Sequence, residues 1–260
     1  MKDIVIEAAR PGDGAGIEAL IKECFDEHQR SLFIYGCDGA ANYIEDGVAY
    51  QDRGGDSAFI VARARRILAF IEVRRLADSV CLNNGATSSE TRGQRTYRQL
   101  MAEAVELGAR EGVTRAVHDV FVGNTIKNFH ERIGYRVTDH FIWRSTQIRQ
   151  GGDNRAAFVG LAQADAVHRR FGFSHVQVLT EQGRYDVGRL GSLWYRLGSA
   201  DVLSDQAALG ALHRLDPSRR LLVIASSSAQ WPAGVPFEVE AESERLEGDV
   251  ETVLSNLRGK

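Results

Sequence analysis

The sequence predicts an α/β protein with two domains, and three observations support this prediction. Strand-like and helix-like segments alternate from residue 3 to residue 148. A strand, a turn and a helix follow one another directly between Leu82 and Met101. A glycine-containing polar stretch at 150–154 then precedes a second region in which helices and strands alternate. We therefore expect a first domain at 1–149, a linker at 150–154 and a smaller α/β domain at 155–260.

The spacing of apolar residues defines the elements of the first domain. Ile4, Ile6 and Ala8 alternate, which predicts a strand at residues 3–8. A turn at 11–14 then precedes a helix. The following elements come next: a helix at 39–50, strands at 57–63, 67–74 and 79–87, a helix at 93–111 ended by Gly112, a strand at 113–122, a helix at 125–133 closed by Gly134, and a strand at 135–148. The predicted order is β-α-α-β-β-β-α-β-α-β.

The second half is read by the same rules. Its expected elements are a helix at 157–171, a strand at 174–180, helices at 187–195 and 204–215, a strand at 220–225 and a terminal helix at 243–257. In the terminal helix, Leu246, Val250, Val253 and Leu257 form an apolar stripe. That stripe predicts a core or interface position.

Composition and charge exclude several classes of protein. The net charge of −3 gives no reason to expect a nucleic acid or an acidic membrane as partner. The cysteines, Cys24, Cys37 and Cys81, lack metal-ligand spacing, and their odd number argues against a disulfide framework. The N-terminal residues contain no apolar signal region, and the aliphatic run at 221–225 is too short to span a bilayer. We therefore predict a cytoplasmic protein without a metal site.

The stretch from Leu82 to Met101 carries the clearest functional pattern. Its helix opens on Arg92-Gly-Gln-Arg-Thr-Tyr97, and the first N–H groups of a helix favour an anion such as phosphate. The stretch resembles the acyl-coenzyme A loop of the GNAT acetyltransferase superfamily, with these residues in register: Leu82, Ala86, Glu90, Arg92 and Gly93. Ser89 replaces a common proline, and Arg95 and Tyr97 replace small residues.

A second stretch, at residues 124–135, extends the resemblance to GNAT proteins. The matching residues are Asn124, Glu131, Arg132, Gly134 and Tyr135, with the spacing shortened by one before the aromatic residue. His130 stands where a tyrosine is usual. The element order and the opening Ile6–Asp13 are also similar to the family, so the resemblance covers a little over half the chain. It implies a mixed, mostly antiparallel central sheet flanked by helices.

The resemblance implies acetyl-CoA, or another acyl-CoA, as co-substrate. The pyrophosphate would lie on the loop, and the pantetheine arm between the fourth and fifth strands. The implied binding residues are Ala86, Thr87, Arg92, Gly93, Gln94, Arg95, Thr96, Tyr97 and Asn124. Asn124 is also expected to cap its helix. Two outcomes stay open for Arg95 and Tyr97: their side chains point outward, with Arg95 contacting phosphate, or they fill the phosphate site. An ordinary helix cap with solvated arginines is the alternative for the whole loop.

The catalytic candidates are His130, Glu72 and His118. His130 is the candidate acid for a departing thiolate, because histidine titrates near neutral pH. Glu72, His118 or Asp119 is the candidate base, and His118 and Asp119 lie on opposite faces of their strand. Each residue has an ordinary structural alternative. Cys81 has no histidine or acid spaced to activate it, so we expect it to be packed.

Three functions fit this sequence. The first is an N-acetyltransferase that moves an acyl group from acetyl-CoA to a small-molecule amine, with the second domain shaping the acceptor site or a homodimer. The second takes the acyl group from an acidic acyl carrier protein, held by a basic surface around Arg92, Arg95 and Arg98. The third is a non-catalytic sensor or scaffold with the GNAT fold.

The second half shows one echo of the first. A helix end, a glycine, an aromatic residue and a strand occur both at 129–135 and at 167–173. The echo is read either as the remnant of a partial second GNAT unit or as a common helix–strand junction, and the junction is favoured for so short a match.

Overall fold

The computed structural model describes residues 4–51, 55–91, 95–148 and 155–259. The chain forms two compact units. The first unit comprises residues 1–26, 40–139 and 244–260, and the second unit comprises residues 27–39 and 140–243. The expected single cut near residue 150 therefore differs from the structure, because residues 27–39 fold with the second unit and residues 244–260 with the first. The linker at 150–154 lies outside the described residues.

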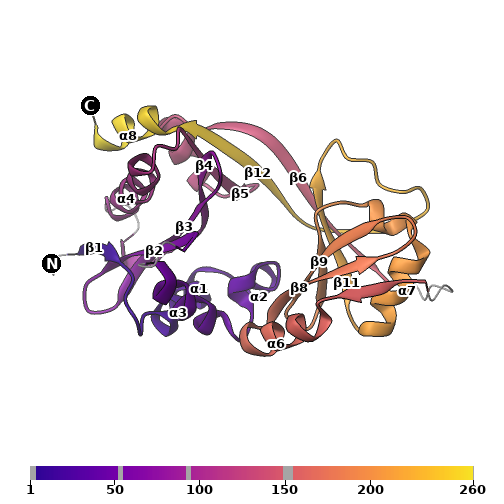
Figure 1. Ribbon diagram of the computed structural model, residues 1–260. Helices are drawn as coiled ribbons and strands as arrows, with labels where there is room; N and C mark the ends of the chain where they lie inside the picture. Colours follow the sequence, from indigo (N-terminus) through magenta and orange to yellow (C-terminus); the bar gives the residue numbers. More distant parts are fainter. Residues whose placement is uncertain (1–3, 52–54, 92–94, 149–154, 260) are drawn as a thin grey trace. The chain divides into compact units, whose positions relative to one another are not determined.

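The strands of the first unit follow the order β1-β2-β3-β4-β5-β12-β6 in a mixed sheet, and β12 and β6 contribute residues 244–249 and 136–139 to this unit. The strands are β1 Val5–Ala8, β2 Ser57–Arg63, β3 Ile67–Arg75, β4 Ser79–Thr87, β5 Arg115–Phe121, β6 Arg136–Gln147 and β12 Glu238–Asp249. β1 to β4 pair antiparallel, whereas β4 and β5 pair parallel (Figure 1). The β-α-α-β-β-β-α-β-α-β order predicted over residues 3–148 is found with one additional helix, the short helix at Glu27–Ser31, and the mixed, mostly antiparallel sheet is confirmed.

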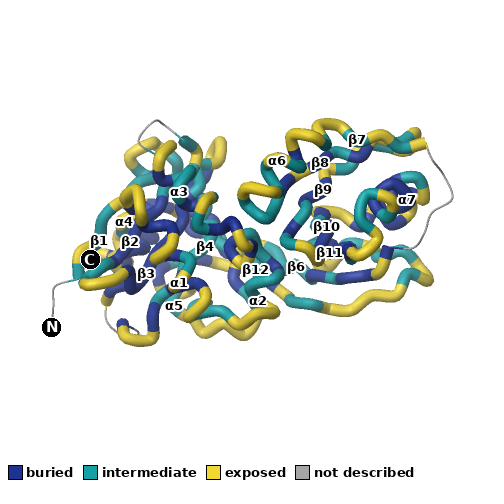
Figure 2. The backbone as a smooth tube through the Cα atoms, turned by 90° about the horizontal axis from the view of Figure 1, so that it is seen from below, coloured by how far each residue is buried: buried dark blue, intermediate teal, exposed yellow. Residues whose placement is uncertain are grey.

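Helices cover both faces of this sheet. They are α1 Gly14–Cys24, α3 Ala40–Gln51, α4 Thr96–Arg110, α5 Ile126–Arg132 and α8 Val250–Arg258, with a 3₁₀ turn at Ser89–Thr91. α1 and α3 pack on β2 and β3, and α4 packs on the sheet and on α8, beside which it lies in Figure 1. Because both faces are covered, seven consecutive residues of β3 are buried, and β2 and β3 are largely dark blue in Figure 2.

Two glycines fix the position and end of α4. A Cβ on Gly108 would stand 2.8 Å from the Val80 side chain, so a glycine lets the helix lie close against β4. Gly112 has φ +79° directly after the helix, which confirms it as the predicted C-terminal glycine. The helix therefore ends where β5 must begin.

The second unit repeats the strand topology of the first. Its strands are β7 Ala157–Val159, β8 Phe173–Leu179, β9 Arg184–Leu190, β10 Trp194–Leu197 and β11 Arg220–Ser226, in the order β6-β11-β10-β9-β8-β7. β7 to β10 pair antiparallel, and β10 and β11 pair parallel. The helices are α2 Glu27–Ser31, α6 Leu161–Phe171 and α7 Gln206–Leu215, with 3₁₀ turns at Ile34–Gly36 and Asp201–Ser204. β7 to β11 thus correspond to β1 to β5, and α7 corresponds to α4.

The sequence echo does not follow this correspondence. Residues 129–135 join α5 to β6, whereas residues 167–173 join α6 to β8, and these junctions occupy different places in the two topologies. Both turn on a glycine with positive φ, Gly134 at +108° and Gly172 at +74°. The local match is therefore a shared helix–strand junction, and the relation between the units lies in their topology.

Three expectations for the second half are wrong. Residues 187–195 form the end of β9, a turn at Gly191 with φ +52° and the start of β10, because their backbone groups pair with neighbouring strands. The segment at 243–249 belongs to β12, and α8 begins only after Asp249, whose carboxylate accepts the N–H of Thr252 at 2.8 Å. Residues 157–159 form β7, and α6 starts after Gly160.

The apolar stripe assigned to the terminal helix is divided between two elements. Leu246 lies on β12, and Val250, Val253 and Leu257 lie on α8. All four are buried in the core of the first unit. Leu246 therefore has helical spacing without being in the helix. The predicted core position is confirmed for all four residues.

Candidate functional site

The parallel strands β4 and β5 stay paired over only part of their length. Their register runs from Ser79 opposite Arg115 to Leu82 opposite His118. β4 then continues to Thr87, paired with β3, and β5 continues to Phe121. The predicted separation of the fourth and fifth strands therefore begins at Leu82 and His118.

A bulge in β4 marks the same point. Val73 of β3 lies opposite Leu82, but Glu72 lies opposite Asn84, so Asn83 is the extra residue. A bulge bends a strand and redirects a side chain. Here it turns the Asn83 amide toward Glu72, to which its Nδ2 donates a short hydrogen bond.

Three predicted site residues meet beside the point where the strands separate. The Tyr97 hydroxyl lies 3.1 Å from His130 Nε2. The rings of His118 and His130 stack, with centroids 4.6 Å apart and planes 10° apart. The structure therefore joins residues from α4, α5 and β5 that are far apart in the sequence.

Both histidines are neutral at physiological pH. Burial lowers the pKa of His130 to about 2, with a smaller contribution from His118, and the His130 side chain is fully buried. Burial also lowers the pKa of His118, against a hydrogen bond to the Leu82 carbonyl that raises it. Because a carbonyl only accepts, His118 Nδ1 at 2.7 Å carries the proton and Nε2 keeps its lone pair. Only His118 thus has a defined basic nitrogen.

The direct acid role predicted for His130 conflicts with this geometry. A neutral imidazole supplies no imidazolium proton, and the contact at Nε2 is the Tyr97 hydroxyl. Among the described residues, Nδ1 of His130 has no hydrogen-bond partner. Any proton leaving His130 through Nε2 passes first to Tyr97.

The Tyr97 side chain lies toward the core. Its ring packs edge-on against Phe129 at 5.5 Å between centroids and joins the core of the first unit. Burial raises the pKa of Tyr97, so the hydroxyl keeps its proton. The two predicted outcomes were an outward-pointing side chain and one that fills the phosphate site. The Tyr97 side chain instead points inward to His130.

Glu72 is held in a buried cluster rather than left open to a substrate. Its side chain is fully buried and accepts from Tyr43 Oη at 2.8 Å, Arg74 Nε at 2.9 Å and Asn83. Arg74 also donates to the Tyr43 hydroxyl at 2.8 Å. With three donors on its oxygens, Glu72 has a structural role as counter-charge to Arg74.

The other strand candidates also have partners. Asp119 accepts two hydrogen bonds of 2.9 Å from Arg245 of β12. Burial raises the pKa of Cys81 to about 11, with the charge of Asp119 adding to the shift, so its thiol stays protonated. His118 and Asp119 take opposite faces of β5, as predicted.

Among the described residues, the N-cap residue of α4 makes no side-chain cap hydrogen bond. The residue at its N-cap is the exposed Arg95, and a guanidinium has no lone pair for the helix N–H groups. A positive charge is also unfavourable at this end of a helix dipole. Thr96, the first helical residue, is buried. Arg92, Gly93 and Gln94 lie outside the described residues.

Arg98 forms its hydrogen bonds with the backbone of α8. Its Nη1 donates to the carbonyls of Asn256 at 3.0 Å and Leu257 at 3.2 Å, near the C-terminal end of α8. Its guanidinium also lies 5.8 Å from the Phe129 ring centroid. The Arg98 side chain is therefore held against the C-terminal end of α8.

Side chains from α1 and the β2–β3 turn fix the segment that follows β4. Arg66 donates to Ser88 Oγ at 3.0 Å and to Glu90 at 2.8 Å, and Ser88 donates to Glu23 at 2.6 Å. Ala86 is buried, and the Thr87 carbonyl accepts from Cys24 at 3.5 Å. This segment positions the approach to α4.

Asn124 caps α5 as predicted. Its Oδ1 accepts the N–H of Ile126 at 3.1 Å, and the residue is exposed. The predicted role at the co-substrate stays a prediction.

Tyr43 and Arg74 were not anticipated from the sequence. Their contact with Glu72 depends on α3 packing beside β3 and on the bulge at Asn83. The sequence contained one signal for this cluster, a glutamate near the end of the otherwise apolar run 67–73. Such a carboxylate needs buried donors, although the sequence did not say which.

Comparison with known proteins assigns the fold. No protein-family model matches the sequence, and a search of curated proteins finds no match. A tandem GNAT protein from the clavulanic acid biosynthesis pathway superimposes with TM-score 0.63 at 10% identity, over 95% of this chain and 99% of that one. A GCN5-related N-acetyltransferase from Sphaerobacter thermophilus gives 0.59 at 15%, over 95% and 96%. A probable N-acyltransferase from Enterococcus faecalis gives 0.57 at 10%, over 97% and 74%.

The chain therefore has the GNAT fold, and the likeness extends through its C-terminal half. The sequence resemblance reached only residues 3–148, so the second unit is the part that the comparison adds. Its earlier description as a smaller, unrecognised α/β domain is replaced by a second GNAT-like unit.

Neither a membrane-spanning helix nor a metal-binding cluster is found among the described residues. None of the described helices combines the length and apolarity that a membrane span requires. Within the same residues, no group of three or more histidine, cysteine, aspartate or glutamate side chains is arranged to hold a metal ion.

Proposed function

We propose that the first unit is an N-acyltransferase that moves an acyl group from an acyl-CoA, with acetyl-CoA the first donor to test, to a small-molecule amine. The observation that carries the proposal is the N-cap of α4, where Arg95 makes no side-chain cap hydrogen bond. An anion there would pair with the helix N–H groups and the guanidinium at once.

The strand geometry supports a donor that enters beside α4. Beyond Leu82, the described register pairs β4 with β3 alone, so its other edge offers backbone groups to an extended ligand. A pantetheine arm has amide groups that match such an edge. Residues 83–87 of β4 and the first turn of α4 would hold the two parts of the donor.

The reaction is a direct transfer. The amine nitrogen attacks the thioester carbon and the carbon–sulfur bond breaks. The amine loses one proton to a base, the thiolate gains one from an acid, and the base then returns its proton to the acid to restore the starting state. We assign His118 Nε2 as the group that accepts the amine proton, because Nδ1 is fixed as a donor by the Leu82 carbonyl. Its low pKa leaves it unprotonated and ready to accept at neutral pH.

The pair of Tyr97 and His130 is assigned to the leaving group. If His130 Nε2 donates to the tyrosine oxygen, the hydroxyl proton is free to point at a thiolate, and the same N–H stabilises the phenolate that forms. This arrangement leaves His130 Nδ1 as an unpaired acceptor, consistent with its lack of a described partner. His130 then acts as a positioning residue, and Tyr97 as the acid.

Calorimetric titration with acetyl-CoA and with free coenzyme A tests the proposal. Micromolar binding of both supports it, and a panel of small amines is then screened for release of free thiol. Tyr97→Phe should bind coenzyme A as the parent does but turn over at least tenfold more slowly. No binding at millimolar ligand would exclude the proposal.

That negative outcome would leave a carrier-bound donor or a non-catalytic module. The acceptor amine and a homodimer stay predictions.

A further inference from the structure

The second unit has a parallel strand pair, β10 and β11, that corresponds to β4 and β5, but its two strands do not separate. β10 pairs with β11 along its whole length, from Trp194 opposite Arg220 to Leu197 opposite Val223, and it ends there. In the first unit, β4 runs five residues past its last pair with β5. The strand edge that a pantetheine arm would use is therefore absent from β10.

The residue at the end of the parallel pairing also differs. By register, Val223 corresponds to His118, since each faces the last paired residue of the preceding strand. Val223 is fully buried in the core of the second unit. Between β10 and α7, Val202 and Leu203 are buried in the same core. This position contains apolar side chains where the first unit has the stacked histidines.

The N-terminus of α7 carries its own anion. The Asp205 carboxylate accepts the N–H groups of Ala207 and Ala208, both at 3.0 Å, and the Thr180 hydroxyl at 2.5 Å. Asp205 is fully buried. Burial alone would raise the pKa of Asp205, but the hydrogen bonds from Thr180, Ala208 and Tyr185 outweigh it and lower the pKa. The carboxylate is therefore charged.

The N-cap residues of α4 and α7 thus carry opposite charges. α4 has Arg95, which offers no acceptor, and α7 has Asp205, which satisfies the N–H groups from inside the protein. A phosphate approaching α7 would meet a buried negative charge and N–H groups that are already bonded.

From these contrasts we infer that the second unit is a GNAT-fold unit whose donor site is closed by its own carboxylate, so that each chain binds one acyl-CoA, in the first unit. The inference rests on the proposed function for the first unit, and on independent observations for the second. It assigns the second unit a role that does not involve an acyl donor.

The test uses the full chain and free coenzyme A as the probe. Calorimetry counts the sites, and hydrogen exchange with and without coenzyme A locates them. We expect one site per chain, with slower exchange in the first turn of α4 and unchanged exchange in the first turn of α7. Arg95→Asp, which gives α4 the cap that α7 has, should weaken binding at least tenfold and leave α7 unchanged.

Two sites per chain, or protection of α7, would overturn the inference while leaving an acyl-CoA-binding protein. One site that protects α4 supports both proposals. If no coenzyme A binds, the proposed function fails, and the expected count of one site per chain fails with it. The two failures are therefore distinguishable.

Discussion

His130 makes the stability of this protein sensitive to acid. Above pH 6.5 the folded and unfolded chains both hold this imidazole neutral. Below it, the unfolded chain binds a proton that the folded chain does not, because the folded pKa is about 2. The free energy of unfolding therefore falls as the pH falls, by about 1.4 kcal/mol at pH 5.5 for this residue.

The measurement is urea unfolding at pH 7.5 and pH 5.5. His130→Phe should lose about 1.4 kcal/mol less between these pH values than the parent. The control is Val253→Ala, which alters the buried core without changing a titratable group and should leave the pH dependence unchanged. Equal pH dependence in His130→Phe and the parent would show that His130 titrates normally in the folded protein.

Glu72 is expected to matter for folding before it matters for chemistry. Glu72→Gln removes the counter-charge of Arg74 and places an amide among three donors, which should cost about 2–3 kcal/mol. The control is Glu111→Gln, which breaks the neighbouring pair with Arg75, where both side chains are about one-third exposed. It should cost less than about 1 kcal/mol.

Denaturant unfolding compares the two variants. Equal losses would mean that the Glu72 cluster is no more than a surface ion pair. A stable Glu72→Gln protein with abolished turnover would instead make Glu72 the base, in place of His118.

At the residue scale, the sequence predicted which residues meet better than it predicted their protonation states. Glu72, His118, His130 and Tyr97 were all named from strand position and family pattern, and the last three do meet. Their roles depended on burial, which sets the pKa of His130, and no spacing rule supplies it.

At the scale of the element, α4 is the clearest test of donor binding. Arg95→Asp introduces a side chain that can cap the helix and complement its dipole, so stability should rise by about 0.5–1 kcal/mol. Affinity for coenzyme A should fall at least tenfold, because the same carboxylate repels phosphate. The opposite signs separate an effect on binding from an effect on folding.

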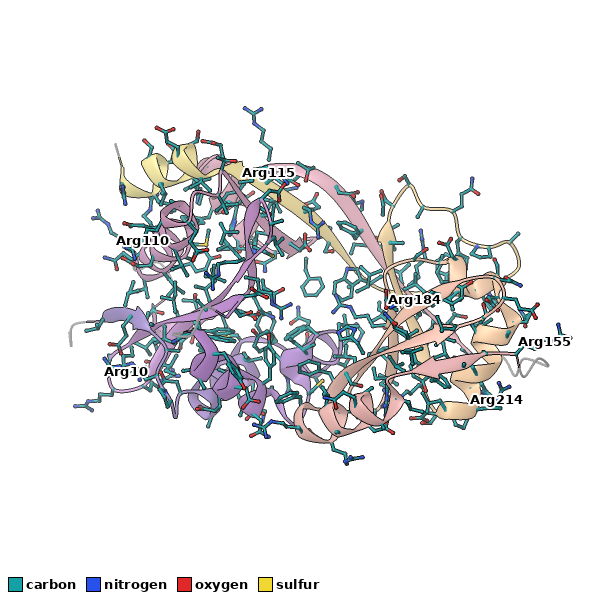
Figure 3. All side chains as sticks on the ribbon, in the orientation of Figure 1. Arg10, Arg110, Arg115, Arg155, Arg184 and Arg214 are labelled. Carbon is teal, nitrogen blue, oxygen red and sulfur yellow. The ribbon has the colours of Figure 1, made fainter. Side chains whose placement is uncertain are left out.

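Arg110→Asp is the matched control. It makes the same change of charge at the other end of α4, where Arg110 is 63% exposed and lies at the outer side of the unit (Figure 3). A negative charge there opposes the dipole, so stability should fall by a few tenths of a kcal/mol while coenzyme A affinity stays the same. Equal losses of affinity in both variants would indicate a general charge effect and remove the assigned phosphate site.

The elements that the sequence predicted well are those with local signals. α4 was defined by its apolar spacing and by Gly112, and α7 was expected within two residues of its start. The end of β9, the start of β10 and the end of β12 were misread as helix because their stability comes from pairing with other strands, such as Trp194 with Arg220. Helical spacing in a short apolar run cannot reveal that pairing.

At the scale of the whole molecule, each unit is assembled from separate parts of the chain. The first unit takes its last strand segment and α8 from residues 244–260. The sequence does not indicate that residues 244–260 belong to the first unit, because the polar stretch at 150–154 looks like an ordinary domain boundary.

A fragment of residues 1–148 should therefore fail to fold, although it contains every element of the sequence resemblance. It lacks four side chains that are buried in the core of the first unit: Leu246, Val250, Val253 and Leu257. Deleting even one such side chain costs about 2–5 kcal/mol, which approaches the whole stability of a domain. It also leaves Arg98 without the carbonyls of Asn256 and Leu257.

Circular dichroism during heating and hydrogen exchange of the fragment test this expectation. The full chain should unfold cooperatively, and the fragment should show no cooperative transition and little protection in β3. Adding back residues 155–260 as a separate chain supplies β12 and α8, and should restore protection in β3 if the missing core is the cause. A cooperatively folded 1–148 fragment would mean that the first unit is complete without its C-terminal segment, and the predicted cut near residue 150 would then be the true boundary.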